Sequence, residues 1–341
     1  MVRMANRNRH RTVFSLGPDR SVSGMVRGAN RNRHRRLGKP TLVECTNLRP
    51  TRVSRYDYPM SNKVTAPLIK DRKGGPKISM VTAYDYPSAV IADRAGVDII
   101  LVGDSVANVV HGMDDTLGVD IDDMILHTRA VKRAKPSAMV VTDMPWLSFH
   151  VSTEETVRNA GRLVREGGAE AVKLEGGVKR IPMVEAILDA EIPVMGHVGL
   201  TPQSVHRMGG FKVQGKVVDV ARSLIADARA LSEAGCFSIV IEGVPDILGE
   251  IITKEVDAPT IGIGAGPHTD GQVLVFHDVL GLGSGKYPKF VRSYASLADD
   301  AVAALERFVA DVGSGSFPGE DESYHVTEEV AAELLGGPSS D

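Results

Sequence analysis

The sequence has only two cysteines, Cys45 and Cys236, among its 341 residues. Two cysteines are too few for a disulfide framework, which excludes the class of small disulfide-stabilised secreted proteins. The scarcity of cysteine is typical of proteins that work in a reducing compartment. We therefore predict a cytoplasmic location.

Long hydrophobic runs are missing as well. Asp104, His111 and Asp143 interrupt the richest apolar stretches, and no 18 consecutive residues are apolar. Because a membrane-spanning helix needs about 20 such residues, we predict no membrane span. At 43% hydrophobic residues the chain can still bury the core of one large α/β domain or of two smaller ones.

The net charge of -3 hides an uneven distribution. Residues 1–59 hold 14 Lys and Arg against three acidic residues, whereas the rest of the chain holds 26 basic and 40 acidic residues. An acidic body argues against nucleic-acid binding by the folded part of the chain. We therefore expect small-molecule partners for that part.

The basic segment 1–59 contains a near-duplicate, because VRMANRNRHR at 2–11 recurs as VRGANRNRHR at 26–35. Two copies without apolar periodicity do not make a solenoid, so the segment is predicted to be a disordered Arg-rich extension. A nucleic-acid-binding arm and a transit peptide are two hypotheses for it. We favour a third, a dispensable extension or start-site artefact, with a more ordinary beginning at Met60.

From Ile78 onward, short β-branched runs alternate with helical patterns. The runs are almost continuously apolar, which is typical of parallel strands covered on both faces. They predict strands at 78–84, 98–103, 138–143, 171–175, 193–197, 237–242, 259–263 and, on the weakest signal, 278–282. Helices are predicted at 120–134, 153–167, 180–190 and 217–235, with Ser152 in position to cap the second of these.

Eight βα units over about 220 residues match the size of a (β/α)8 TIM barrel. We predict this barrel at residues 60–325, followed by an acidic C-terminal tail at 326–341. An open, doubly wound sheet is the alternative fold. That fold requires a glycine fingerprint after its first strand, where this chain has Tyr84-Asp-Tyr-Pro instead.

Polar residues follow five consecutive predicted strands. In a barrel, the carboxyl ends of all strands point to one face, where active sites form. Each polar residue alone has a structural explanation, since an Asp after a strand commonly caps a helix or forms a turn. Five ionisable positions on one rim indicate an active site, and the candidates are Asp104, Asp143, Lys173 with Glu175, His197, and Glu242.

The types of residue on this rim indicate a chemistry. Asp104, Asp143 and Glu175 are hard oxygen ligands that suit Mg²⁺, and a 2-oxo acid can chelate such an ion. The metal would then stabilise the enolate formed when the adjacent carbon loses its proton. Glu242, which is not needed as a ligand, is the candidate base. Lys173 either neutralises substrate charge or forms a structural ion pair, and both interpretations stay open.

Several ordered segments between residues 77 and 325 carry a family resemblance. They include TAYDY at 82–86, LVGDS at 101–105, VKLEGG at 172–177, GHVGLTPQS at 196–204, GGFKVQG at 209–215 and IGIGAG at 261–266. In these segments the chain resembles the ketopantoate hydroxymethyltransferase family. One departure is Gly243, which stands where a cysteine would be expected after the base.

The resemblance implies a (β/α)8 barrel that assembles as a homodecamer or another large homo-oligomer. It implies transfer of a hydroxymethyl group from 5,10-methylenetetrahydrofolate, or a related pterin, to 3-methyl-2-oxobutanoate in pantothenate and coenzyme A biosynthesis, with one Mg²⁺ per subunit. The family's metal-site carboxylates fall on Asp104, Asp143 and Glu175, and its proton acceptor on Glu242. Its contacts to the keto acid fall on Asp104, Ser105, Asp143 and Lys173, with His197 near the substrate.

Two other classes of function are alternatives to this one. A Mg²⁺-dependent lyase or mutase of the phosphoenolpyruvate-mutase and isocitrate-lyase type would use the same barrel and enolate, but such lyases carry a cysteine-bearing loop after strand 5. Here that region reads GHVGLTPQS. A non-catalytic or nucleic-acid-binding barrel is the second alternative, and the five retained ionisable positions argue against it.

A protein that begins at Met60 is expected to fold, assemble and turn over like the full chain, because the composition of residues 1–59 does not favour a packed structure. Circular dichroism, sedimentation and specific activity of both forms would test this. If truncation prevented assembly, the extension would have to pack into the structure.

Overall fold

The computed structural model describes residues 63–283 and 287–336. The Arg-rich extension at 1–59, with its repeat, lies outside the described residues, and the predictions about it stay predictions.

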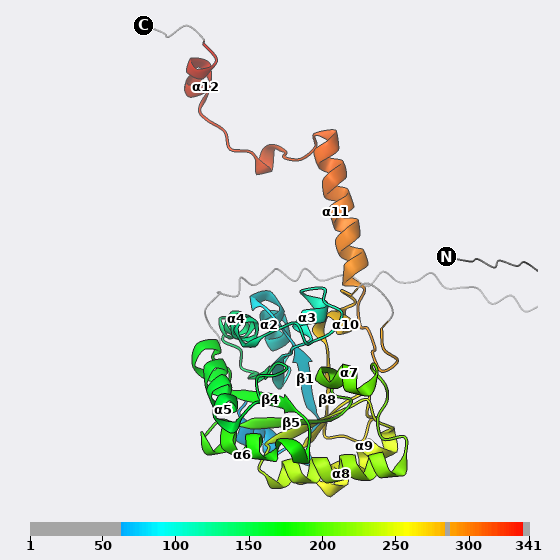
Figure 1. The fold of residues 1–341 in the computed structure, drawn as a ribbon. Helices are drawn as coiled ribbons and strands as arrows, with labels where there is room; N and C mark the ends of the chain where they lie inside the picture. Colours follow the sequence, from blue (N-terminus) through cyan, green and yellow to red (C-terminus); the bar gives the residue numbers. More distant parts are fainter. Residues whose placement is uncertain (1–62, 284–286, 337–341) are drawn as a thin grey trace, which may run out of the picture. The chain divides into compact units, whose positions relative to one another are not determined.

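Eight parallel strands form a closed barrel in which each strand pairs with the next along the chain and the last pairs with the first (Figure 1). The predicted TIM barrel is therefore confirmed. The strands are β1 (Ile78–Thr82), β2 (Ile99–Val102), β3 (Met139–Asp143), β4 (Ala171–Glu175), β5 (Val194–Gly199), β6 (Ser238–Glu242), β7 (Thr260–Ile263) and β8 (Gly271–Leu274).

Helices lie between the strands and around the barrel (Figure 1). All four predicted helices are present, and Ser152 caps one of them by accepting a hydrogen bond from the backbone N–H of Glu155, as predicted. The helices are α1 (Ala66–Lys70), α2 (Tyr86–Arg94), α3 (Val106–Val109), α4 (Ile121–Lys132), α5 (Thr153–Arg162), α6 (Ile181–Asp189), α7 (Val205–Met208), α8 (Val218–Glu233), α9 (Asp246–Glu255), α10 (Phe276–Leu280), α11 (Leu297–Ser314) and α12 (Glu328–Leu334).

The buried apolar side chains form two clusters that the alternation of a β-strand explains. In β2, Ile99 and Leu101 belong to the cluster inside the barrel, while Ile100 and Val102 belong to the cluster between strands and helices. Both faces of each strand are thus covered, which accounts for the continuous apolar runs in the sequence. The same alternation decides which residues at the strand ends point into the barrel.

The prediction for the eighth strand was wrong. The apolar run at 278–282 begins inside helix α10, and β8 is instead the short segment Gly271–Leu274, which pairs with β1 and β7. A four-residue strand with a glycine and a glutamine gives little apolar signal. Its glycine is needed, because a Cβ on Gly271 would lie 2.4 Å from the carbonyl oxygen of Ile78.

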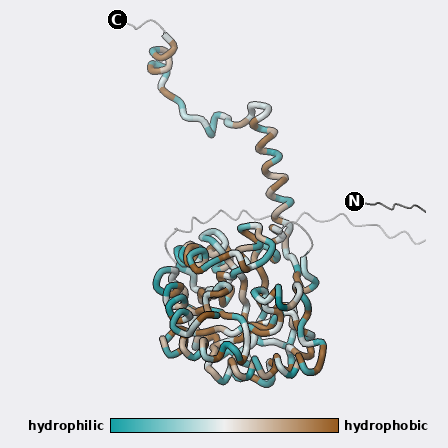
Figure 2. Tube along the Cα trace, in the orientation of Figure 1, coloured by the Kyte–Doolittle hydropathy of each residue, from teal (hydrophilic) through white to brown (hydrophobic). Residues whose placement is uncertain are grey.

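Helix α11 has no buried residue in the single chain. Hydrophobic and hydrophilic residues alternate along it (Figure 2), and Val302, Leu305 and Val309 are all more than half exposed. Their spacing of three and four residues places them on one side of the helix. Among the described residues, no helix is both long enough and apolar enough to cross a membrane.

Candidate active site

The alternation of the barrel strands brings the predicted site residues to its interior. Asp143 lies two residues after the interior-facing Val141, and Lys173 and Glu175 lie two and four residues after the interior-facing Ala171. Because side chains two residues apart share a face of a strand, all three point into the barrel at its C-terminal end.

All seven predicted site residues line one cavity of about 150 Å³ at this end of the barrel. All eight strands contribute to its wall, and the cavity has room for a ligand of a few carbon atoms, given that a water molecule occupies roughly 30 Å³. The predicted residues that line it are Asp104, Ser105, Asp143, Lys173, Glu175, His197 and Glu242.

A lysine and two aspartates form one buried part of the site. Lys173 Nζ lies 2.5 Å from Asp143 Oδ1, and Asp143 Oδ2 accepts a hydrogen bond from the backbone N–H of Asp104 at 3.1 Å. Burial alone would lower the pKa of Lys173, but the carboxylates around it together raise that pKa above its ordinary value. The lysine is therefore charged, and its ion pair with Asp143 is present in the structure.

The carboxylates outnumber this lysine. Burial and the neighbouring Asp143 raise the pKa of Asp104 to about 7. Burial and the charge of Asp104 raise the pKa of Glu175 well above its ordinary value. Several buried acidic groups held near one cation are costly to ionise together. The site is therefore suited to receive further positive charge.

The proposed metal ligands do not form a preformed metal cluster. Within the described ranges, no three acidic, histidine or cysteine side chains converge closely enough to hold an ion as they stand. Asp104 and Asp143 are adjacent, whereas Glu175 Oε2 accepts a hydrogen bond from the backbone N–H of Gln203 at 3.0 Å. The three-carboxylate ligand set therefore stays a prediction.

His197 lies between two glutamates. Its Nε2 is 3.3 Å from Glu242 Oε2, and its Nδ1 is 3.6 Å from Glu175 Oε1. Burial and the charge of Lys173 lower the pKa of His197, so the ring is neutral at pH 7. Glu242 is the more accessible of the two glutamates, with 16% of its side chain exposed against 5% for Glu175.

Two glycines fix the backbone around Glu242. Gly199 has a φ of +99°, and a Cβ there would lie 2.2 Å from the carbonyl oxygen of Glu242. Gly243 has a φ of +57°, a conformation that favours glycine over residues with a Cβ. The glycine that departs from the family pattern is therefore well suited to the turn that follows Glu242.

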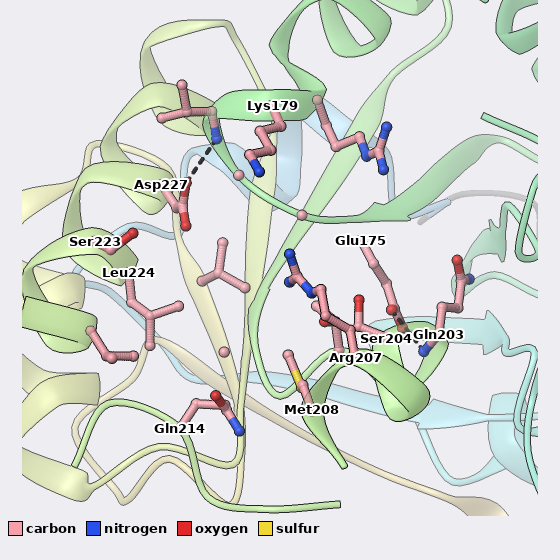
Figure 3. Close-up of a pocket in the computed structure, with 18 of the residues that line it drawn as sticks. Glu175, Lys179, Gln203, Ser204, Arg207, Met208, Gln214, Ser223, Leu224 and Asp227 are labelled. Atoms are coloured by element: carbon pink, nitrogen blue, oxygen red, sulfur yellow. Dashed lines mark hydrogen bonds between the residues drawn. The ribbon is translucent and has the colours of Figure 1, made fainter. Parts of the chain in front are cut away.

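Two residues of the site were not predicted. Tyr84, almost fully buried, has its hydroxyl 2.9 Å from Ser105 Oγ, and burial raises its pKa so that the phenol stays protonated. Gln203 donates from Nε2 to Asp104 Oδ2 at 2.8 Å and lies next to Glu175 (Figure 3). Both fall inside ordered segments of the sequence, TAYDY and GHVGLTPQS, and that position was the available signal.

A family model described as ketopantoate hydroxymethyltransferase matches residues 63–320 of the chain. A curated protein of Syntrophomonas wolfei named 3-methyl-2-oxobutanoate hydroxymethyltransferase is 56% identical over 273 residues, which cover 80% of this chain and 99% of that protein. A protein of the same name from Pelobacter propionicus is 54% identical over 267 residues, covering 78% of this chain and 99% of that one.

Solved structures with low sequence identity share the fold. A phosphonopyruvate hydrolase superimposes with a TM-score of 0.50 at 14% identity, over 80% of this chain and 95% of that one. An oxaloacetate acetylhydrolase superimposes with a TM-score of 0.50 at 13% identity, over 83% of this chain and 100% of that one. At such identities the likeness shows the barrel and does not extend to the reaction.

Proposed function

Because the chain belongs to the ketopantoate hydroxymethyltransferase family, we propose that it transfers a hydroxymethyl group from 5,10-methylenetetrahydrofolate, or a related pterin, to 3-methyl-2-oxobutanoate. The chain is thus a transferase, and its product in this proposal is 2-dehydropantoate. The high identity to hydroxymethyltransferases favours this function over a lyase or mutase on the same barrel.

The observation that carries the proposal is the small cavity in which an acid–base group, a lysine and three buried carboxylates meet. Its size suits a short oxo acid. Its polar groups come from the ends of different strands, which hold them on a rigid frame. The residues of this cavity are also the residues to which the family resemblance assigns the metal, the base and the contacts to the keto acid.

A divalent cation fits the donors of this site. Lys173 is the single cation among Asp104, Asp143, Glu175 and Glu242 in the cavity wall described here, so negative charge remains to be balanced. We assign Mg²⁺, one per subunit, to Asp104 and Asp143, with Glu175 near it. When bound, the ion withdraws electron density from the keto group and so acidifies the adjacent carbon.

Glu242 is the proposed base that takes the proton from C3 of the keto acid. Its carboxylate lines the cavity and is the most exposed of the acidic groups there, so a substrate can reach it. His197 Nε2 lies 3.3 Å from Glu242 Oε2 without a formed hydrogen bond, and a rotation of the neutral ring would let it donate one to this carboxylate. This contact would orient the carboxylate toward the cavity.

Lys173 and Ser105 are the proposed contacts of the keto acid. Lys173 can contact the substrate while it stays paired with Asp143, because its ammonium group carries three donors. Ser105 lines the cavity and is held by the protonated hydroxyl of Tyr84. Together these groups would fix the oxo acid with its C3 facing Glu242.

We further propose that the enzyme works in the cytoplasm as a homodecamer or another large homo-oligomer. The exposed apolar side of α11 supports association, because burial of such side chains against another surface is favourable. Cys236 is free and buried, which agrees with a reducing compartment, and Cys45 lies outside the described residues.

A coupled turnover assay tests the proposed function. The purified enzyme is expected to form 2-dehydropantoate from 3-methyl-2-oxobutanoate with 5,10-methylenetetrahydrofolate, or with a modified pterin, as one-carbon donor. Product would be measured by mass spectrometry in parallel reactions with each donor. If neither donor gave product while the enzyme released or isomerised a related oxo acid, a lyase or mutase would replace the transferase.

A further inference from the structure

A second, larger pocket lies next to the active-site cavity. It has a volume of about 740 Å³ and is formed by the turns after β4 and β5 together with helix α8 (Figure 3). The two spaces are neighbours, with Glu175 in the wall of each.

The two spaces differ in what they can hold. The cavity of about 150 Å³ admits a short oxo acid but not a one-carbon carrier built from a pterin, an aromatic ring and a tail. Most of such a carrier must therefore lie outside the cavity. The larger pocket has apolar walls from Trp146, Val198 and Leu224, which suit the aromatic portion.

Three cations line the same pocket, namely Lys179, Arg180 and Arg207. Within residues 63–283 and 287–336, none of them forms an ion pair with an acidic side chain, whereas Arg162 and Arg229 elsewhere on the barrel do. The carboxylate of Asp227 lines this pocket too, but it accepts a hydrogen bond from the backbone N–H of Val178 at 2.8 Å. Lys179 and Arg207 extend into the pocket from different segments (Figure 3).

The cations also act on one another. Burial and the charge of Arg207 lower the pKa of the Arg180 guanidinium. Burial and the charge of Arg180 lower the pKa of His150 to about 4. Arg180 is held in place by its stacking above the Phe149 ring, 5.6 Å from the ring centroid. Like charges kept together in a half-buried pocket favour the binding of an anion.

We propose that this pocket binds the one-carbon carrier through its anionic tail, with Arg180 and Arg207 paired to the carboxylates of a γ-linked oligoglutamate and Lys179 near the tail's end. The inference rests on the proposed function, since it concerns the second substrate of that reaction. It implies that the enzyme prefers a carrier with several glutamates over one with a single glutamate. Arginine suits this task because its planar donors bind carboxylates in pairs.

The test compares the binding of monoglutamyl and triglutamyl tetrahydrofolate to the full chain by isothermal titration calorimetry. The wild type is expected to bind the triglutamyl form more tightly, by roughly tenfold for each charge-assisted contact that the longer tail adds. This preference should shrink as salt is added. In Arg180→Gln and in Arg207→Gln the ratio of the two affinities should fall by about tenfold.

Two variants serve as controls. Arg222→Gln removes the same charge from helix α8 at a side chain that is 77% exposed and does not line the pocket, so the ratio should stay as in the wild type. Arg180→Lys keeps the charge and should restore part of the preference. The ratio is measured within one variant, so a general loss of folded protein lowers the number of binding sites for both carriers and leaves the ratio of affinities unchanged.

Equal affinities of the wild type for both carriers would overturn the inference, as would a preference that survives both glutamine variants. If Arg180→Gln changed the mass of the assembly but not the ratio, the pocket would be a contact between copies of the chain. Transfer assays of the wild type with the monoglutamyl carrier separate the two proposals. If product formed but the two carriers bound equally well, this inference alone would be wrong. If the triglutamyl carrier bound more tightly but no product formed, the proposed function would be wrong.

Discussion

Replacing Glu242 with glutamine is expected to slow, by the same large factor, both turnover and the exchange of the C3 hydrogen of 3-methyl-2-oxobutanoate with solvent. Glutamine keeps the shape and polarity of the side chain but has no basic oxygen. The rate should fall by roughly 10²–10⁴-fold, the usual contribution of a positioned general base. Exchange into heavy water, followed by NMR, isolates the proton transfer because it requires the base and the metal but not the one-carbon donor.

The same variant should still bind the metal and the keto acid, because neither task is assigned to Glu242. A matched control is Glu250→Gln on helix α9, where the glutamate pairs with Lys254 at 2.6 Å on the surface. Loss of such a surface pair costs little, so exchange there should match the wild type. If Glu242→Gln exchanged the C3 hydrogen at the wild-type rate, another group would be the base, and His197 would be the next candidate.

The sequence predicted the barrel because seven of its strands carry β-branched runs that are buried on both faces. Ile99 to Val102 is such a run, and its four residues divide between the two core clusters. The eighth strand escaped prediction because Gly271 and Gln272 serve packing and hydrogen bonding, not hydrophobic burial. Gln272 Nε2, for example, donates to the carbonyl oxygen of Gly266 at 2.9 Å.

The sequence predicted those residues of the candidate site that lie at the C-terminal ends of strands. Asp143, Glu175 and Glu242 each terminate a strand, and parallel strands in a barrel bring their ends to one face. Gln203 comes from a 3₁₀ turn after β5, and only the folded loop brings its amide to Asp104. The pocket beside the cavity was beyond prediction for the same reason, since Arg180 lies in a 3₁₀ turn after β4 and Arg207 lies in helix α7 after β5.

The backbone conformation around Glu242 was also not predictable from the sequence. In the sequence, Gly243 stands out only as a departure from the family pattern. In the structure its φ of +57° shows a turn that glycine adopts without strain. Gly199, from the neighbouring strand, lies against the carbonyl oxygen of Glu242, a contact that depends on the register of β5 and β6. Such a contact requires the three-dimensional pairing, which periodicity alone does not supply.

Removal of divalent metal is expected to abolish turnover completely. EDTA treatment followed by gel filtration should give inactive protein, and Mg²⁺, Mn²⁺ or Co²⁺ should restore activity, because the enolate needs a Lewis acid at the keto oxygen. Asp104→Asn and Asp143→Asn should raise the metal concentration needed for half-maximal turnover by about 10–100-fold or more. Substitution of a residue that only hydrogen-bonds to a metal ligand already lowers metal affinity by about that factor, and a ligand itself should matter at least as much. Excess metal should then rescue part of the activity.

Direct metal binding separates this role from a purely structural one. Titration calorimetry with Mn²⁺ should show weaker binding in both aspartate variants, while Asp219→Asn, whose side chain is 92% exposed at the start of α8, should bind like the wild type. Asp143→Asn also removes the partner of Lys173, so its loss of stability should exceed that of Asp104→Asn. Full activity in a metal-free preparation would contradict the metal-assisted mechanism. In that case Lys173, as the remaining cation of the cavity, would have to stabilise the enolate.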